Sequence, residues 1–385
     1  MNEKKSNGTW KLPLYKIYTD DEDVNLITKI IKRGSNWAIG PEIEEFESAI
    51  SNYVGVDYCT VLNSGTSSLH ATLLAFELGN GDEILVPSFS FVSTANSVLF
   101  VNATPSFVDI EEKTFGLNPE LIKEKISSST KAIIPMDYGG MSCQISEIKK
   151  HAENNDLLLI EDCAESLGSS INGKKVGSIS DAAIFSFCGN KVLTTGEGGA
   201  VVTNSRDIYD KIKLIRSHGR LDQTNYFENP SSSQYLTLGY NWRMSSITAA
   251  LGLTQLNKLE KIIKMRKNNA NYLSSKLSKF SQIKVPTPPN GYDHIYQMFT
   301  IRLPDRNIRN SLHDFLTSRR IFSKVYFTPI HTTSFYQQKF SIDNNSLPIT
   351  EKISNQVLTL PLYPNMTMEE KDLLVQTISE FFEEK

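Results

Sequence analysis

Lys191 is the residue of this sequence whose type and place suit covalent chemistry best. It follows an apolar run and lies among small and hydroxylated residues, in the segment FSFCGNKVLTTGEGG at 185–199. An amine that forms an imine must be reachable and partly deprotonated, and burial favours the neutral amine. The glycines would let the backbone approach a bound ligand closely. A lysine in such a place is more often an ordinary loop residue, so its neighbours must decide.

An acid ends a second apolar run, Leu157–Glu161, which is followed by Asp162. Ligands of α/β sheets bind outside the carboxyl ends of the parallel strands, where both Asp162 and Lys191 would emerge. Alone, such an acid is more often a helix cap or a salt-bridge member. Pyridoxal 5'-phosphate (PLP) needs both groups, because a lysine forms the imine and an acid keeps the pyridine nitrogen protonated. The pair therefore predicts a PLP site with Lys191 and Asp162 as catalytic residues.

A turn rich in hydroxyl groups is a candidate phosphate site. The segment VLNSGTSS passes from a predicted strand into a predicted helix through Ser64, Gly65 and Thr66. Free N–H groups and the positive dipole end make a helix N-terminus suited to phosphate. Many such turns bind nothing, so this one gains weight only beside the lysine and the acid. Phe89 and Phe91 follow the next strand, where a ring would lie against a flat cofactor or in the core.

Seven short runs alternate with helical patterns between about residues 58 and 205, which predicts an α/β fold with a mostly parallel sheet. Most of the runs are apolar throughout, as strands buried on both faces are. The predicted strands are Tyr58–Leu62, Glu83–Pro87, Thr104–Asp109, Ala132–Met136, Leu157–Glu161, Ala182–Phe187 and Ala200–Thr203. The predicted helices between them include Ser67–Glu77, Pro119–Lys125 and Ile145–Asn154.

The length of 385 residues predicts a large domain and a smaller one, since single cores stop growing at roughly 250–300 residues. A helical pattern without internal proline runs from about Ser245 to Lys279 and is expected to link them. We expect residues 1–255 to form the large PLP-binding domain and 256–385 a small α+β domain. The elements expected in the small domain are strands near Ile295–Arg302 and Ser323–Phe327, a helix near Ile308–Ser318, and a last helix opened by a capping box from Thr367 to Glu370.

Composition narrows the class of protein. The net charge is -3 and 22% of residues are charged, so no strong field exists to attract nucleic acid or an anionic membrane. Neither a signal peptide nor a run of 18 apolar residues is visible, and we expect a cytoplasmic enzyme. The cysteines form no CxxC pair and no histidines cluster, so we expect no metal site and reduced thiols, mostly in the core. They are Cys59, Cys143, Cys163 and Cys188.

Six motifs in order resemble the DegT/DnrJ/EryC1/StrS family of sugar aminotransferases, PLP enzymes of fold type I. The motifs are NSGTSSLH at 63–70, VPSFSFVSTAN at 86–96, EDCAES at 161–166, FSFCGNKVLTTGEGG at 185–199, RSHG at 216–219 and GYNWRMSSI at 239–247. The resemblance extends from about residue 12 to 382. It implies a seven-stranded large domain, a smaller C-terminal domain and transamination, because Lys191 is kept where a dehydrating member has histidine.

By position, the resemblance implies roles for residues around the cofactor ring. Lys191 would form the internal aldimine, Asp162 would pair with the pyridine nitrogen, and Phe91 would stack on the ring. Glu165 would lie near the ring hydroxyl, where other members often have Gln or His.

The resemblance also implies how the phosphate is bound and how the subunits are arranged. The phosphate would be held by Ser64, Gly65, Thr66 and Ser186. Asn241 is, by family pattern, contributed from the neighbouring subunit, which implies a homodimer with a shared active site.

The substrates implied by the resemblance are L-glutamate as amino donor and a nucleotide-linked ketosugar as acceptor. The GNK triplet, TTGEGG and VYFTPIH are most similar to the perosamine branch, which acts on GDP-linked 4-keto-6-deoxymannose for O-antigen or other polysaccharide biosynthesis. A 3-aminotransferase, or an enzyme for dTDP- or UDP-linked sugars, is the alternative. The candidate substrate contacts are Glu197, Arg243 and His331.

Each of these contacts has a plainer alternative, and so does the activity. Arg243 suits a substrate anion or the dimer interface equally, since arginine binds carboxylate or phosphate in bidentate pairs. His331 is nearly as often a loop histidine with local hydrogen bonds. A regulator that binds PLP or a nucleotide sugar without turnover is the alternative of another class, and no DNA-binding appendage is visible to favour it.

Overall fold

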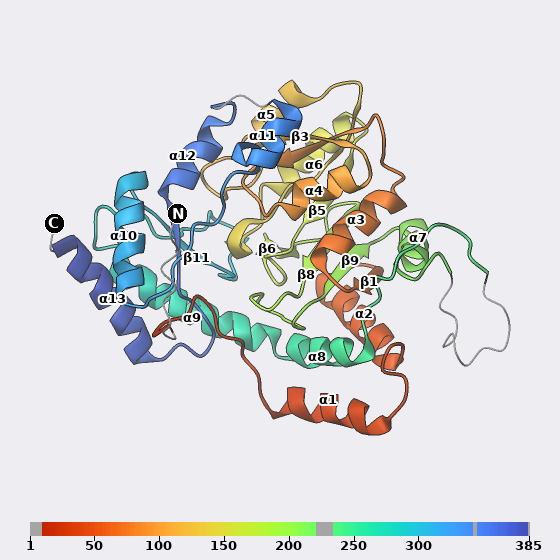
Figure 1. Ribbon diagram of the computed structural model, residues 1–385, viewed down its shortest axis with the longest axis horizontal. Coiled ribbons are helices and arrows are strands. Elements are labelled where there is room, and N and C mark those ends of the chain that lie inside the picture. Colours follow the sequence, from red (N-terminus) through yellow and green to blue (C-terminus); the bar gives the residue numbers. More distant parts are fainter. Residues whose placement is uncertain (1–9, 221–233, 342–344, 384–385) are drawn as a thin grey trace.

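The computed structural model describes residues 10–220, 234–341 and 345–383, and its centre is a seven-stranded sheet (Figure 1). In spatial order the strands are β1 (Tyr58–Leu62), β9 (Gly199–Thr203), β8 (Ala182–Ser186), β5 (Leu158–Asp162), β4 (Thr130–Ile133), β2 (Glu83–Pro87) and β3 (Thr104–Val108). Strand β9 is antiparallel to both of its neighbours, and the other pairs are parallel. The predicted α/β class with a mostly parallel seven-stranded sheet is confirmed.

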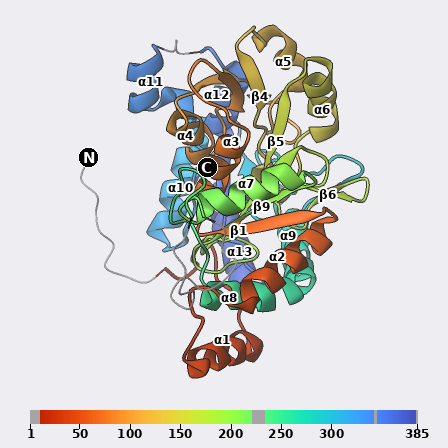
Figure 2. The same ribbon diagram turned by 90° about the vertical axis from the view of Figure 1, so that its right-hand side faces the viewer.

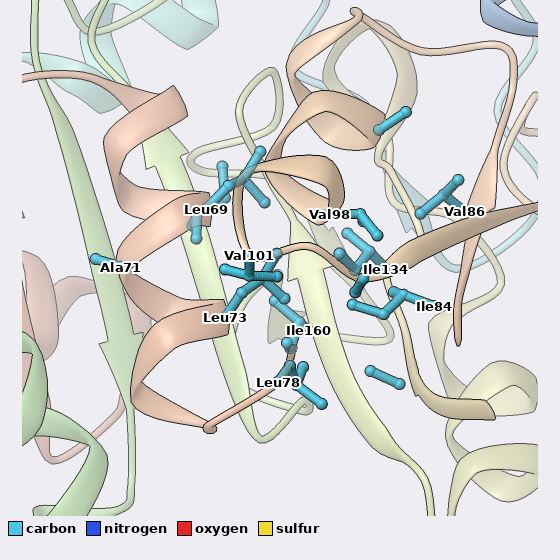
Figure 3. Close-up of a cluster of buried hydrophobic side chains, with 14 of the residues drawn as sticks. Leu69, Ala71, Leu73, Leu78, Ile84, Val86, Val98, Val101, Ile134 and Ile160 are labelled. Carbon is cyan, nitrogen blue, oxygen red and sulfur yellow. The ribbon is translucent and has the colours of Figure 1, made fainter. Parts of the chain in front are cut away.

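Helices cover both faces of this sheet (Figure 2). One face is covered by α3 (Gly65–Ala75), α4 (Ser93–Phe100) and α7 (Arg206–Arg216), and the other by α2 (Pro41–Val54), α5 (Pro119–Lys125), α6 (Ile145–Asn154) and α8 (Ser246–Asn257). Successive side chains of a strand point to opposite faces. Ile160 accordingly packs with Leu69 and Val98 under α3 and α4 (Figure 3), whereas Leu159 packs with Ile148 of α6. The alternation along β5 decides which of its carboxylates faces which layer.

A smaller unit follows, with its own buried cluster. It is built from α9 (Leu259–Leu277), β11 (Phe299–Arg302), α10 (Arg306–Ser318), β12 (Val357–Leu360) and α13 (Met368–Glu383). Strands β11 and β12 are antiparallel, and Phe299 and Leu360 are buried with Leu312 and Ile378. Leu12, from the other end of the chain, is buried in the same cluster. The boundary near residue 255 remains a prediction.

The remaining elements connect these layers. They are α1 (Asp21–Arg33), β6 (Ser170–Ile171), β7 (Lys174–Lys175), β10 (Tyr292–Asp293), α11 (Ser334–Phe340), α12 (Pro348–Gln356) and the 3-10 turns η1 (Tyr138–Gly140) and η2 (Ile330–Thr332). The capping box before α13 is confirmed, because the Thr367 N–H donates to Glu370 and the Glu370 N–H donates to the Thr367 hydroxyl.

The expected long helix from Ser245 to Lys279 is in fact two helices. Helix α8 ends at Asn257 and α9 begins at Leu259, with Lys258 between them at φ -104° and ψ 5°. The buried ammonium group of Lys258 forms ion pairs with Asp20 and Asp23 beside α1. Helix α8 packs on α1 and α2, whereas α9 continues into the smaller unit, so one straight axis cannot serve both contacts.

The expected strand Ser323–Phe327 is not a strand. Lys324 makes an isolated antiparallel bridge with Thr359, with N–H to O distances of 3.0 and 2.8 Å. The chain then leaves the edge of β12, because Val325 and Phe327 belong to a separate buried cluster at the junction of the two units. The strand expected at Ile295–Arg302 is shorter than predicted, since β11 begins at Phe299.

Two expectations about composition can be compared with the structure. Cys59, Cys143 and Cys163 are buried and Cys188 is half-buried, and all four are free thiols, as predicted. Within the described residues, no helix is both long enough and apolar enough to cross a bilayer.

Candidate active site

The amine of Lys191 lies beside a carboxylate that comes from the loop after β5. Its Nζ is 3.3 Å from Glu165 Oε1, and both side chains are largely buried. The other oxygen of Glu165 accepts the Gly139 N–H at 3.0 Å, which fixes the carboxylate in place. Strand β8 ends at Ser186, and the loop that follows carries the lysine to the edge of the sheet. Lys191 and Glu165 therefore form one preorganised pair.

The loop that carries Lys191 is held from the smaller unit by one side chain. Gln297 Oε1 accepts the Val192 N–H at 2.8 Å, and Gln297 Nε2 donates to the Asn190 carbonyl at 2.8 Å. These two hydrogen bonds fix the backbone on both sides of Lys191. The position of the amine consequently depends on how the smaller unit packs against the sheet.

Asp162 ends β5 and its side chain points toward α4. Thr94 Oγ1 donates to its Oδ2 at 2.8 Å, and the Ala164 N–H donates to its Oδ1 at 3.1 Å. Burial raises the pKa of the Asp162 carboxyl, while these two hydrogen bonds and the positive charge of Lys191 act in the opposite direction. A buried acid held this way suits a cationic ring nitrogen, which would restore the ionised form.

The N-terminus of α3 opens toward the same edge of the sheet. Ser64 caps it through a capping box with Ser67, whose N–H donates to Ser64 Oγ at 3.0 Å. The first intrahelical bond is that from the Ser68 N–H, so the amides of Gly65 and Thr66 precede it and suit an anion. A Cβ at Gly65 would lie 2.9 Å from that of Ser186, so only glycine lets this turn approach β8.

These groups converge on one cavity of about 750 Å³. It brings together most of the predicted site residues, namely Ser64, Gly65, Thr66, Phe91, Asp162, Glu165, Ser186, Lys191 and Glu197. Phe91 is 59% exposed here, whereas Phe89 is fully buried and stacks on Tyr138 at 5.2 Å between ring centroids. Although both phenylalanines follow the same strand, Phe91 lines the cavity and Phe89 lies in the core.

Three predicted residues do not line this cavity. Asn241 is exposed and pairs with Ser217 in an isolated bridge, and Arg243 donates to Ser217 Oγ at 3.1 Å. His331 is 1% exposed, with Nδ1 2.7 Å from Ser88 Oγ and Nε2 3.3 Å from a glutamate of α12. These are the local hydrogen bonds expected of an ordinary loop histidine. The geometry of His331 does not support a contact with the substrate.

Several residues in or beside the cavity were missed by the sequence analysis. Thr94 acts through Asp162, Gln297 acts through the lysine loop, and Tyr15, Lys324 and Tyr326 line the mouth. Thr94 lies within the quoted VPSFSFVSTAN motif, so its place was visible but its partner was not. Tyr326 likewise lies within the quoted VYFTPIH segment, whereas Gln297, Tyr15 and Lys324 lie outside the quoted motifs, and no local spacing links them to the site.

The side chains and backbone amides that line the cavity fit the functional groups of PLP. A lysine amine, a buried acid and a helix N-terminus line one cavity, as required to hold the aldehyde carbon, the pyridine nitrogen and the phosphate. At about 750 Å³, the cavity lies within the roughly 300–1,000 Å³ usual for pockets that bind drug-sized ligands.

Comparison with known proteins agrees with this site. The family model described as DegT/DnrJ/EryC1/StrS aminotransferase family matches residues 18–379. The chain is 33% identical over 346 residues to a GDP-perosamine synthase of Escherichia coli O157:H7, covering 90% of this chain and 92% of the relative. It is 31% identical over 374 residues to a GDP-perosamine synthase of Vibrio cholerae, covering 96% and 99%.

A solved structure extends the likeness to the whole fold. PseC of Helicobacter pylori, an aminotransferase involved in the biosynthesis of pseudoaminic acid, superposes with a TM-score of 0.90 at 28% identity, covering 97% of this chain and 100% of that one. The cofactor is PLP, which agrees with the lysine, the acid and the helix N-terminus at the cavity. The chain belongs to the DegT/DnrJ/EryC1/StrS aminotransferase family and is a PLP-dependent sugar aminotransferase.

Proposed function

We propose that this enzyme transfers the amino group of L-glutamate to C4 of GDP-linked 4-keto-6-deoxymannose, giving GDP-perosamine. The observation that carries the reaction is the convergence of Lys191 and Asp162 on one cavity large enough for cofactor and sugar. The sugar and nucleotide rest on likeness to two relatives that bear the name GDP-perosamine synthase. Amination at C3, or a dTDP- or UDP-linked substrate, is the alternative.

Lys191 and Asp162 have different roles in this proposal. When bound, PLP supplies an electron sink that stabilises negative charge on the substrate carbon. Lys191 would hold the cofactor, and its amine would accept and return a proton at the substrate carbon. Asp162 would keep the ring nitrogen protonated, and Glu165 would orient the Lys191 amine through the 3.3 Å contact. Phe91 would lie against the ring, and the amides of Gly65 and Thr66 together with Ser186 would hold the phosphate.

The acceptor end of the cavity contains a cation that suits a nucleotide diphosphate. Lys324 is exposed at the cavity wall, and its Nζ lies 4.7 Å from the centroid of the Tyr326 ring. Backbone bonds to Thr359 fix its Cα, so the flexible part is the side chain alone. We assign Lys324 to the diphosphate, and the rings of Tyr15 and Tyr326 to the sugar or base.

A homodimer belongs to the same proposal. Asn241 is exposed and lies outside the cavity of its own chain, and the half-exposed Phe91 leaves one side of the cavity uncovered. Leu238, close to Asn241, is 78% exposed, and Leu236 is 57% exposed. A second copy would cover these apolar side chains and bring its Asn241 to the cofactor.

One experiment tests the reaction. The purified enzyme with PLP is given L-glutamate and, in parallel, GDP-, dTDP- and UDP-linked 4-ketosugars, and products are detected by mass and located by NMR. We expect an absorbance band of the cofactor that glutamate shifts and that is absent in Lys191→Ala, and amination of the GDP sugar at C4. A band insensitive to glutamate would favour a binding protein without turnover, and amination at C3 would refute the assignment of position.

A mixing experiment tests the shared site. Lys191→Ala and Asn241→Ala are each expected to be inactive, and unfolding and reassembly together would create hybrid dimers with one intact site. Random pairing restores roughly a quarter of the native sites, since half the dimers are hybrids and half of their sites are complete. No recovery on mixing, with dimers confirmed by light scattering, would exclude a site shared in this way.

A further inference from the structure

A second pair of acids lies on the opposite face of β5 from Asp162. Glu161 precedes Asp162 in the strand and therefore points away from the cavity, toward the layer of α5 and α6. Asp137, which follows β4, lies beside it, and both are fully buried. One ligand atom from each of these acids and one from Cys163 lie within 4.8 Å of one another.

Asp137 joins two turns through its side chain and its backbone. Its Oδ1 accepts the Cys143 N–H at 2.8 Å, and its Oδ2 accepts the Ser166 hydroxyl at 2.8 Å. Its own N–H donates to the Asp162 carbonyl at 3.1 Å. One residue thus ties the segment Asp137–Cys143 to the loop that contains Asp162 and Ser166.

The same segment reaches the reactive lysine. Two residues after Asp137, the Gly139 N–H donates to Glu165 Oε2, and Glu165 contacts Lys191 with its other oxygen. The loop between Asp162 and Ser166 is therefore held at three points by residues 137–143. Both acids of the cofactor site, Asp162 and Glu165, depend on these contacts for their position.

Glu161 is the less satisfied of the buried pair. Its Oε2 accepts the Gly177 N–H at 2.9 Å and the Ser180 hydroxyl at 3.3 Å. Its Oε1 is buried and has no hydrogen-bond partner within the described residues. An ionised carboxylate with an orphaned oxygen is expensive to bury, whereas a protonated one places a hydrogen there.

The groups around the pair do not neutralise two charges. The hydrogen bonds to Asp137 and Glu161 come from backbone amides, serine hydroxyls and cysteine thiols, and none in the described part of the chain comes from lysine or arginine. The other ionisable neighbours are themselves acids, namely Cys143, Cys163, Tyr292 and Glu111. Two adjacent carboxylates without a cation cannot both stay ionised in this environment.

Burial raises the pKa of both carboxyls, and more so for the one with fewer donors. The pKa of Asp137 rises to about 6, opposed by hydrogen bonds from Cys143 and Ser166. The pKa of Glu161 rises well above 4.5, with burial as the main cause and the charge of Asp137 next. At neutral pH the charge therefore resides on Asp137 and the proton on Glu161.

We propose that Asp137 and Glu161 form a buried carboxyl pair that holds a single proton, and that Asp137 is the positioning residue that keeps Asp162 and Glu165 aligned on the cofactor. The roles of Asp162 and Glu165 rest on the proposed function above. The anionic Asp137 accepts two hydrogen bonds that a neutral acid or amide cannot both accept equally well. Protonated Glu161 allows that charge to persist beside it.

The test compares three variants of the holoenzyme. Glu161→Gln copies the protonated acid, Glu161→Ala removes it, and Asp137→Asn removes the charge at nearly constant shape. For each, PLP affinity is measured from the cofactor absorbance, the band is recorded from pH 5 to 9, and Tm is measured over the same range. Metal content of the purified native enzyme and of Glu161→Gln is determined by mass spectrometry.

We expect Glu161→Gln to keep native PLP affinity and to reduce the fall in Tm as the pH rises above 4.5, because the raised pKa of Glu161 stabilises the folded chain only while the acid is protonated. Asp137→Asn is expected to bind PLP roughly tenfold more weakly, with an altered band, since one charge-assisted hydrogen bond is lost. Glu161→Ala should lower Tm, and the Gln variant should restore it. Equal damage by Gln and Ala, or one equivalent of divalent metal lost in Glu161→Gln, would overturn the shared proton.

The outcomes separate this inference from the proposed function. If Lys191→Ala abolishes the band but Asp137→Asn changes neither affinity nor band, Asp137 does not position the site and the proposed function stands. If Lys191→Ala retains the band, the assignment of the lysine fails whatever the Asp137 variant does.

Discussion

Glu161 and Asp162 are adjacent carboxyl residues on one strand, and their surroundings differ in kind. Asp162 faces α4 and the cavity, where Thr94 and Ala164 donate to it and Lys191 supplies positive charge. Glu161 faces the other layer, where serine and backbone donors reach one oxygen only. Both are buried. The comparison teaches that a cation within reach, more than burial, separates an acid that can act as an ion from one that must be neutral.

The largest expected effect is on catalysis, from the Asp162 side of the strand. Asp162→Ala should lower kcat/KM roughly 10³-fold, within the range usual for loss of a proton-handling group. Tm should also fall, because the Ala164 N–H and the Thr94 hydroxyl lose a buried acceptor. Glu161→Gln is the matched control, and kcat/KM of this variant should stay close to native. A comparable loss of kcat/KM in both variants would show that the two faces of the strand do not differ in their importance for catalysis.

The next effect is on stability, from the Glu161 side. Glu161→Ala should lower the free energy of unfolding by about 2–3 kcal/mol, because Gly177 N–H and the Ser180 hydroxyl lose a buried acceptor. Denaturant unfolding measures this, and Ser180→Ala is the control that removes one weak donor alone. An Ala variant as stable as the native enzyme would mean that these bonds contribute nothing net.

A third prediction concerns pH. Asp137 has a folded pKa of about 6, above its ordinary 3.8, so the folded chain retains a proton that the unfolded chain releases first. Its contribution to stability is complete below pH 3.8, falls as the pH rises, and is lost above about 6. Asp137→Asn should flatten the dependence of unfolding free energy on pH in this window. A native curve that instead rises with pH there, when the other acids are allowed for, would contradict the raised pKa.

The smallest expected effect comes from Thr94, which positions Asp162 but does not itself take part in the reaction. Thr94→Val removes the hydroxyl that donates to Asp162 Oδ2 and keeps the volume of the side chain. We expect kcat to fall roughly tenfold and the fold to persist, since one hydrogen bond to a charged group contributes about 1.5–3 kcal/mol. The pH profile of kcat should shift upward with it. Thr94→Ser retains the hydroxyl and should restore native kinetics.

Residues in similar sequence contexts lie in different environments in the structure. Phe89 and Phe91 both follow β2, yet one is buried against Tyr138 and the other stands at the cavity. His331 follows a predicted strand, but it turns inward to Ser88. The cause is that pointing direction depends on the local backbone after a strand ends, where no regular period applies.

The sequence by itself determined the fold class, the seven strands and the lysine, acid and turn, because strand periodicity and strand ends are local properties. Strand and helix limits carried over within a few residues, except at Lys258 and Ser323–Phe327, where packing between distant segments broke the pattern. Only the tertiary structure placed Gln297 on the lysine loop and Asp137 behind Asp162. Such contacts join residues far apart in the chain. Composition and local spacing therefore do not predict which of these surfaces will pack together.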